Sequence, residues 1–507
     1  MNYSHKYKKN ILTFAALWIV SFAFIQIVSI STSLLNPYYF HYDSAYFQSV
    51  GKQWVAGFLP YRDFFDHKGP LIHLINACAY LTSYPRLSLG VIQAFSLCTT
   101  LFVLLKLFKE YMSLKRALLC LAVILAFWSF MFDGGNMTEE YCMPLSVLSL
   151  YLEFKWLKKY SESSDDPEYS HPAFLFFIDG LCVGIIFMIN MKNAASIIIF
   201  DLCIAVLMLK DRKYQDFVKN ALAAVAGAIC PMILFSVYFA VNDAFYEMIK
   251  DAFLFVFSYA SSRELTVPAG YMVIFSIPEI LLLLTGVWCF YINRKLLGTV
   301  AIVWSVTLYA IFYTGFKHYF MSGIPLLAMA VVLIHIRGGG DKERNKVDRL
   351  FRVIFWSACF FVLLVAVIYL PRTMNTYSRE AVEESKNCVA ALQDSVSVIP
   401  ENERDDVMVY NLDGLPMSFY IINELGMKFN HPYLTEFHMS YDPDLRDYTL
   451  NHIKKEKPLW IIMPEESTDP LITGYIKQNY ELKAGYPVKM DIKMCKYDSD
   501  IQVWHKN

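Results

Sequence analysis

Four ionisable side chains of opposite sign fall within one short, turn-rich segment of the chain. Asp43, Asp63, Asp66 and Lys68 lie within 26 residues, interrupted by glycines and prolines that favour turns, and His67 lies among them. In such a segment a carboxylate can act as a general base toward a hydroxyl group. A lysine can hold a phosphate group as a point charge. The segment therefore has groups suited to acid–base chemistry beside a phosphate.

Three later segments carry a second set of candidate residues, each next to an apolar run. They are Glu139 and Glu140, then Lys192, then the pair Lys317 and His318. A lipid whose phosphate lies at headgroup depth would meet Lys68, Lys192 and Lys317 without any charge being buried in hydrocarbon. The layout suits an enzyme that acts on a lipid-linked phosphate.

Each of these residues also has a simpler interpretation. Asp43 is a good N-cap for a helix that begins at Ser44, and Asp63 suits a turn. Lysines near a membrane surface often only anchor a helix in the headgroup layer. Glu139 and Glu140 precede an apolar run, where the helix dipole favours acids. His41 and Arg263 are weaker candidates for the same site.

Long apolar segments must position these residues. Only 18% of the 507 residues are charged, whereas soluble chains have about a quarter. Charge is sparse from Ile11 to Leu370 and ordinary from Arg372 onward, and the net charge of −1 gives no field for nucleic acid. A membrane-crossing helix needs roughly 20 apolar residues. We expect about eleven spans, at 11–32, 87–108, 117–132, 141–157, 173–190, 194–210, 219–241, 270–292, 296–314, 319–336 and 351–371.

The basic residues orient these spans, because lysine and arginine concentrate in cytoplasmic loops. With the N-terminal lysines inside, the loops on the same side carry Lys106–Arg116, Lys155–Lys159, Lys210–Lys213, Arg294–Lys295 and Arg337–Arg352. The outer loops are then 33–86, 133–140, 191–193, 242–269 and 315–318. The apolar run 71–83 is too short to span, so we expect a juxtamembrane or re-entrant helix there.

The tail from Arg372 alternates short apolar strands with helices, which suggests a small α/β domain. We expect strands at Val407–Asn411 and Leu459–Met463, and helices at Arg379–Gln393, Met417–Leu425 and Asp444–Lys455. The sequence thus predicts an α-helical polytopic membrane domain over 1–371 and a soluble extracytoplasmic α/β domain over 372–507.

The first outer loop resembles that of the GT-C superfamily of membrane glycosyltransferases. The similarity is to the bacterial branch of RgtA/B/C/D-like sugar transferases, aminoarabinose transferases and protein O-mannosyltransferases. The shared pattern is an early acid (Asp43), then G-x-x-P-Y-x-D (Gly57–Asp63), then Lys-Gly-Pro (Lys68–Pro70). Three later segments are also similar to this family: Asn136–Glu140, Lys192–Ala194 and Lys317–Phe320. The resemblance therefore covers about 330 residues.

This resemblance implies a GT-C-like fold in a bacterial cytoplasmic membrane, surrounded by membrane lipids. It implies an inverting glycosyltransferase that moves a sugar from a polyprenyl-phosphate donor to a hydroxyl of a lipid, cell-surface glycan or protein acceptor. Asp43 would be the catalytic carboxylate and Lys68 would hold the donor phosphate. Many relatives carry a second acid after the first, whereas here Ser44 follows Asp43. A divalent cation therefore stays an open question, with Asp66 or Glu139–Glu140 as substitute ligands.

Two other functions compete with this interpretation. A transporter or flippase of a lipid-linked glycan is suggested by Asp179, Asp201 and Glu279, which fall inside predicted spans. We expect these acids to face the bundle interior, because each would cost about 2.5–3.5 kcal/mol facing lipid. The sequence shows no clear internal repeat of the kind found in many transporters. A third possibility is a non-catalytic receptor or scaffold in which the tail domain has the main role. It would leave the charges of the first loop unexplained.

Overall fold

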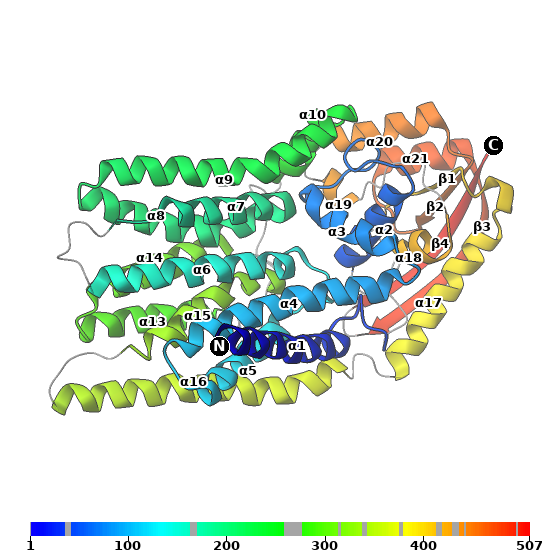
Figure 1. Cartoon of the computed structure of the whole chain (residues 1–507). Coiled ribbons are helices and arrows are strands. Elements are labelled where there is room, and N and C mark those ends of the chain that lie inside the picture. The colour runs from blue at the N-terminus through cyan, green and yellow to red at the C-terminus, as the bar shows by residue number, and fades with distance from the viewer. Residues whose placement is uncertain are drawn as a thin grey trace.

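The computed structural model describes residues 2–35, 42–162, 170–257, 276–312, 316–336, 342–374, 379–411, 418–427, 436–440, 443–492 and 495–507. Helices make up most of them, and a small sheet lies near the C-terminus (Figure 1).

A helix occupies the place of each predicted span, although residues 270–275 of one span lie outside the described part of the chain. The helices are α1 (Asn2–Val28), α4 (Pro85–Lys109), α5 (Leu114–Met131), α6 (Thr138–Glu162), α7 (Ala173–Asn190), α8 (Ala195–Lys210), α9 (Tyr214–Val241), α13 (Ile277–Tyr291), α14 (Lys295–Phe312), α15 (Ile324–Leu333) and α16 (Lys342–Met374). Among the described residues, six helical stretches are long and apolar enough to cross a membrane. The prediction of a polytopic helical membrane protein is confirmed.

Close backbone contact between α7 and α9 shows how the chain folds back on itself. A Cβ atom on Gly180 would lie 2.0 Å from the carbonyl oxygen of Ala224, and one on Gly184 would lie 2.3 Å from that of Ala228. The contacts advance by four residues in the same direction on both helices, so α7 and α9 run parallel. The helix between them, α8, therefore returns the chain through the bundle, and the short η1 (Met191–Ala194) makes the turn.

Two acids that were expected to avoid lipid are buried in this bundle. Asp179 on α7 is 0% exposed and Glu279 on α13 is 4% exposed. Asp201 on α8 is partly buried. The expectation that these side chains face the interior is confirmed for the first two.

Short helices gather at one end of the bundle. The helix predicted at 71–83 is confirmed as α3 (Pro70–Tyr80), which packs on α2 (Tyr42–Val55) where Gly51 meets the backbone of Asn76 and Ala77. Beyond α9 follow α10 (Phe245–Ile249) and η2 (Lys250–Leu254), and η3 (Lys317–Gly323) leads into α15.

The C-terminal region forms one four-stranded sheet with helices beside it. Its elements are α17 (Arg379–Ser397), η5 (Glu401–Glu403), β1 (Val407–Val409), α18 (Ser418–Glu424), α19 (Glu436–Met439), α20 (Pro443–Glu456), β2 (Trp460–Pro464), α21 (Pro470–Asn479), β3 (Tyr480–Ile492) and β4 (Cys495–Lys506). The strand order is β1-β2-β4-β3, with β1 and β2 parallel and the other pairs antiparallel. The predicted strands and helices are confirmed. The hairpin β3–β4 and helix α21 were not predicted.

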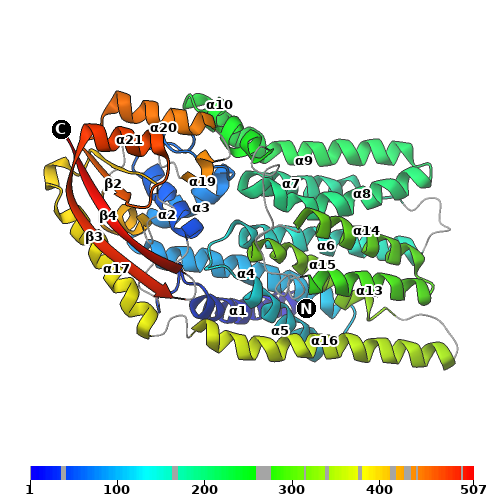
Figure 2. The same cartoon turned by 180° about the vertical axis from the view of Figure 1, so that it is seen from behind.

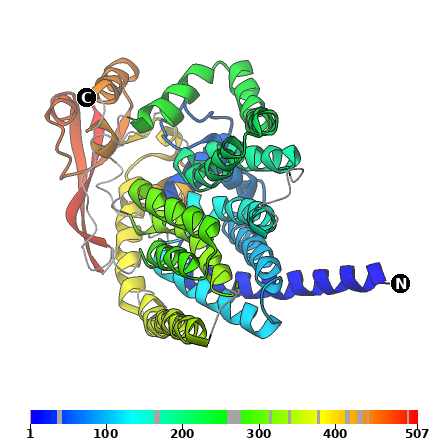
Figure 3. The ribbon, with the colours of Figure 1, turned by 90° about the vertical axis from the view of Figure 1, so that its left-hand side faces the viewer.

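The sheet and its helices pack against the bundle end that carries α2 and α3 (Figures 1 and 2). The ring of Phe419 on α18 contacts Tyr42 and Tyr46 on α2, with centroid distances of 5.0 and 5.3 Å. Figure 3 shows α1 projecting from the side of the bundle, away from the sheet. The first loop therefore lies between the bundle and the C-terminal region.

Candidate functional site

The start of α2 carries Asp43 and is tied to the loop between α5 and α6. Asp43 lies in the first turn of α2 and is half-buried. Next to it, Ser44 Oγ accepts a hydrogen bond from Asn136 Nδ2 (3.1 Å), which also donates to Asn76 Oδ1 (2.9 Å). Asn136 has a φ of 62° and receives a third bond from the hydroxyl of Tyr141 (2.7 Å). One residue with a left-handed backbone thus links the start of α2 to the loop between α5 and α6, beside Asp43.

A buried charge cluster lies at the end of the first loop. Asp66 is 3% exposed, and its Oδ2 lies 2.8 Å from Nε2 of His73 on α3. Its Oδ1 lies 3.6 Å from Nδ1 of His67 and accepts a hydrogen bond from the backbone of Lys68 (3.2 Å). Burial opposes ionisation of Asp66, but the hydrogen bond and charge of His73, with His67 and Lys68, outweigh it and lower the pKa of Asp66. Asp66 therefore stays an anion at neutral pH.

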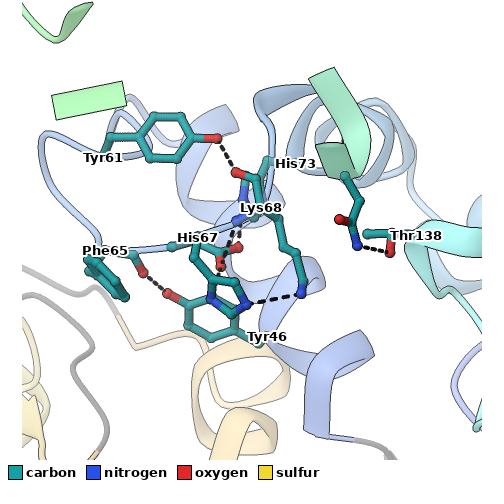
Figure 4. A network of polar contacts seen from close by, with 9 residues as sticks. Tyr46, Tyr61, Phe65, His67, Lys68, His73 and Thr138 are labelled. Atoms are coloured by element: carbon teal, nitrogen blue, oxygen red, sulfur yellow. Dashed lines mark hydrogen bonds and ion pairs between the residues drawn. The ribbon is translucent and has the colours of Figure 1, made fainter. Parts of the chain in front are cut away.

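Lys68 is held from both its backbone and its side chain (Figure 4). Its carbonyl oxygen accepts a hydrogen bond from the Tyr61 hydroxyl (2.6 Å), and its Nζ lies 3.0 Å from His67 Nε2. The next residue, Gly69, donates to the carbonyl of Ile189 (3.0 Å), and a Cβ atom there would lie 2.4 Å from the Met188 backbone. A glycine is thus required for the loop to dock on the C-terminal end of α7.

A second cluster forms around Asp133, at the C-terminal end of α5. Its two carboxylate oxygens lie 3.0 Å from Lys317 Nζ and 2.8 Å from His318 Nδ1. Next to this pair, Lys192 Nζ lies 3.4 Å from the centroid of the Tyr319 ring, a cation–π contact. Asp133 and Tyr319 therefore bring together the side chains of Lys192 from η1 and of Lys317 and His318 from η3, which are far apart in the sequence.

The two acids at the start of α6 are buried and hydrogen-bonded. Glu139 is 0% exposed and accepts from Thr138 Oγ1 (2.9 Å) and Asn193 Nδ2 (3.3 Å). Glu140 is 1% exposed and accepts from Gln93 Nε2 (2.5 Å) and the backbone of Met137 (3.0 Å). Glu139 connects α6 to Asn193, the neighbour of Lys192.

Asp63 has the geometry of a turn residue. Its Oδ2 accepts from the backbone N–H of Leu59 (2.6 Å), and its carboxylate pairs with Arg62 (2.9 Å). Tyr61, which lies between Leu59 and Asp63 in the chain, has a φ of 70°. Asp63 therefore holds a strained turn of the first loop. His41 and Arg263 lie outside the described residues.

Three residues that organise these clusters were not among the predicted site residues: His73, Asp133 and Asn136. Asp133 lies in a predicted outer loop, and Asn136 follows Gly134 and Gly135, whose φ angles are also positive. That Gly-Gly-Asn run is the one sequence signal for a tight, functional turn. Nothing in the sequence pairs His73 with Asp66, because the pairing depends on the angle between α3 and the loop.

The carboxylates of these clusters are directed at protein donors rather than at one common point. In the part of the chain that the structure describes, no three His, Cys, Asp or Glu side chains are placed to hold a metal ion. Asp66 contacts His73, and Asp133 contacts Lys317 and His318.

Comparison with known proteins finds similarity in structure. No family model matches the chain, and no curated protein matches its sequence. Two crystal structures of ArnT from Cupriavidus metallidurans each cover 97% of this chain and 97% of their own, at 12% sequence identity. The TM-score is 0.54 for the state bound to undecaprenyl phosphate and 0.55 for the apo state. The oligosaccharyltransferase of Archaeoglobus fulgidus, in complex with Zn and sulfate, has a TM-score of 0.45 at 10% identity, covering 88% of this chain and 68% of its own. The chain thus has the fold of ArnT along nearly its whole length, and the predicted GT-C-like fold is confirmed.

Proposed function

We propose that this protein is an inverting glycosyltransferase that moves a sugar from a polyprenyl-phosphate donor to a hydroxyl of a lipid, cell-surface glycan or protein acceptor. One observation carries the proposal: the first loop with Asp43 and Lys68, η1 with Lys192 and η3 with Lys317 lie at the same end of the bundle, joined by hydrogen bonds between these segments. The ArnT structure with the same fold binds undecaprenyl phosphate, which supports a donor of this class.

The chemistry follows from the groups present. Asp43 accepts the proton of the acceptor hydroxyl while the hydroxyl oxygen attacks the anomeric carbon from the face opposite the phosphate. The bond between that carbon and the phosphate oxygen breaks, and the oxygen keeps the electron pair. The released phosphate monoester gains one negative charge. Lys68 favours this step because a fixed cation stabilises charge that develops in the transition state.

The cluster around Asp133 could bind phosphate oxygens of the donor that Lys68 does not contact. Lys192 lies over the Tyr319 ring, and Asp133 fixes the direction of the ammonium group of Lys317, two residues before Tyr319 in the chain. His318 is only 6% exposed at its side chain and shares the Asp133 carboxylate. The loop that carries Lys68 docks next to η1, because Gly69 donates to the carbonyl of Ile189 at the end of α7.

We place the site at the outer face of a bacterial cytoplasmic membrane. The loops rich in lysine and arginine follow the opposite helix ends, which the positive-inside rule assigns to the cytoplasm. In this orientation residues 1–371 form the membrane domain and residues 372–507 form an extracytoplasmic domain over the site.

Two substitutions test the proposal. Asp43→Asn should lower sugar transfer about 10²–10⁴-fold, because it removes a positioned base, while binding of undecaprenyl phosphate to the purified protein stays unchanged. Lys68→Met should weaken that binding about 10-fold or more, because it removes a hydrogen bond to a charged group. Asp498→Asn and Lys489→Met, at an exposed ion pair on β3 and β4, are matched controls.

Full transfer activity in the Asp43→Asn protein would refute the catalytic role. A flippase makes a different prediction: lipid-linked glycan would cross the bilayer of reconstituted vesicles, without sugar transfer, whether or not Asp43 is present.

A further inference from the structure

A carboxylate clamp fixes the short helix α19 to the sheet of the C-terminal region. Glu436, the first residue of α19, accepts hydrogen bonds from the backbone N–H of Thr468 (3.0 Å to each oxygen), the Thr468 hydroxyl (2.8 Å) and the backbone N–H of Asp469 (3.1 Å). The Tyr410 hydroxyl adds a fourth donor at 2.9 Å. Hydrogen bonds to an ionised acceptor are the strong ones, so the start of α19 is firmly held.

The clamp lies where the two parallel strands end. Tyr410 directly follows β1, and Thr468 and Asp469 follow β2. Since β1 and β2 are buried along their length, their ends are fixed points of the fold. Glu436 therefore transmits the rigidity of the sheet to a helix of only four residues.

That helix presents His438 to the first loop of the membrane region. The His438 ring is 8% exposed, and its centroid lies 5.1 Å from the ring of His67, 5.3 Å from Phe65 and 6.2 Å from Phe255. Phe65 and Phe255 also contact each other edge to face at 5.0 Å. Three distant parts of the chain thus enclose the His67 ring in one aromatic cluster.

The orientation of the His67 ring sets the position of the Lys68 ammonium group. Lys68 Nζ lies 3.0 Å from His67 Nε2, and an ammonium group can only donate. His67 Nε2 must then be the acceptor, which leaves the proton on Nδ1, toward Asp66 Oδ1 at 3.6 Å. A rotation of this ring would remove the acceptor from Lys68.

We propose that the C-terminal region positions the donor-phosphate lysine: Glu436 anchors α19, so that His438 packs on His67 and holds its ring against Lys68. Glu436 and His438 are positioning residues, because they act on Lys68 through the His67 ring. The inference rests on the proposed function, since it gives Lys68 the role of phosphate ligand. It assigns to the C-terminal region a part in donor binding.

The test measures affinity of the purified full-length protein for undecaprenyl phosphate and for undecaprenol, which has the same chain without the phosphate. His438→Ala and Glu436→Gln should weaken undecaprenyl phosphate binding about 3- to 10-fold, the range expected from losing one aromatic pair. Their affinity for undecaprenol should not change. His438→Phe keeps the aromatic packing on His67 and should restore most of the lost affinity.

A matched control is Glu403→Gln. Glu403 is also a carboxylate that accepts a hydrogen bond within the C-terminal region, from Trp460 Nε1 (2.7 Å), but it does not belong to the aromatic cluster. This variant should bind both lipids like the wild type. The unfolding temperature of each variant separates a loss of fold from a loss of phosphate affinity, and the conservative Phe and Gln variants keep the test open if His438→Ala fails to fold.

Two outcomes distinguish the two proposals. If the His438 and Glu436 variants bind undecaprenyl phosphate like the wild type while Lys68→Met does not, the positioning role is overturned and the proposed function stands. If the wild-type protein itself binds undecaprenyl phosphate no better than undecaprenol, the donor site is wrong and the proposed function fails with it.

Discussion

Asp66 and Asp43 are both acids of the first loop, but their surroundings give them different tasks. Asp66 is buried against His73, His67 and Lys68, which together lower its pKa in spite of its burial. Such a carboxylate is a poor base, because protonating it would cost these interactions. Asp43 is half-buried at a helix start, and the proposed function gives it the role of the base. The first loop thus carries one acid that organises the buried cluster and one that is only half-buried.

The lowered pKa of Asp66 makes a prediction about stability and pH. A carboxylate with a lowered folded-state pKa stabilises the fold above its unfolded pKa of about 3.9, and this contribution is lost as the pH falls through the folded value. Asp66→Asn should lower the free energy of unfolding by about 3–5 kcal/mol at neutral pH, since it leaves His73 buried without its partner. Thermal unfolding of both proteins between pH 3 and pH 7 measures the difference, which should shrink below about pH 4. A difference that stays constant over this range would contradict the electrostatic explanation.

The sequence indicated candidate site residues by type and by loop, but not their partners in the structure. Asp66, His67 and Lys68 were predicted together because they are neighbours in the chain. The partnership of Asp133 with Lys317 crosses from α5 to η3, and no periodicity within either segment encodes it. His438 was missed for the same reason: α19 has four residues, too few for a helical pattern, and its contacts are all with distant segments.

At the scale of elements, the length of the apolar runs located the long helices, because a segment in lipid must satisfy its backbone hydrogen bonds within its own helix. The same reasoning failed for β3 and β4. Gly485 and Pro487 interrupt the alternation of β3, and both are normally depleted in strands. The structure accommodates Pro487 because β3 is the edge strand of the sheet, where a missing N–H breaks no essential ladder bond.

The contact between α7 and α9 provides a prediction at this scale. Gly180→Ala would place a methyl group 2.0 Å from the Ala224 carbonyl oxygen, so the two helices must separate. We expect a loss of about 1–3 kcal/mol in stability, typical of overpacking, measured as a lower unfolding temperature in detergent. Gly474→Ala in α21 is the matched control, because its added methyl group meets nothing within 4 Å. That change should raise stability by about 0.5–1 kcal/mol. Equal effects at both positions would show that α7 and α9 are not in close contact.

On the scale of the whole molecule, the charged residues of the candidate site and the basic loops lie at opposite ends of the bundle. The candidate site, α2, α3 and the C-terminal region share one end of the bundle (Figure 1), and the loops richest in lysine and arginine follow the helix ends at the other. α4 connects the two ends. Its 25 residues extend about 37 Å at 1.5 Å per residue, more than the hydrocarbon core of a bilayer.

This polarity predicts which end of α4 is accessible from outside the cell. Ser83 and Ser113 are exposed and lie just before and just after α4. In a protein whose exposed Cys78 and Cys230 are replaced by serine, Ser83→Cys should react with a membrane-impermeant maleimide in intact spheroplasts. Ser113→Cys should react only after permeabilisation, because the positive-inside rule places its basic loop in the cytoplasm. The reverse pattern would put the Asp43 and Lys68 loop on the cytoplasmic side and remove the proposed reaction from the outer face. Labelling of both positions in intact spheroplasts would instead mean that α4 does not cross the membrane.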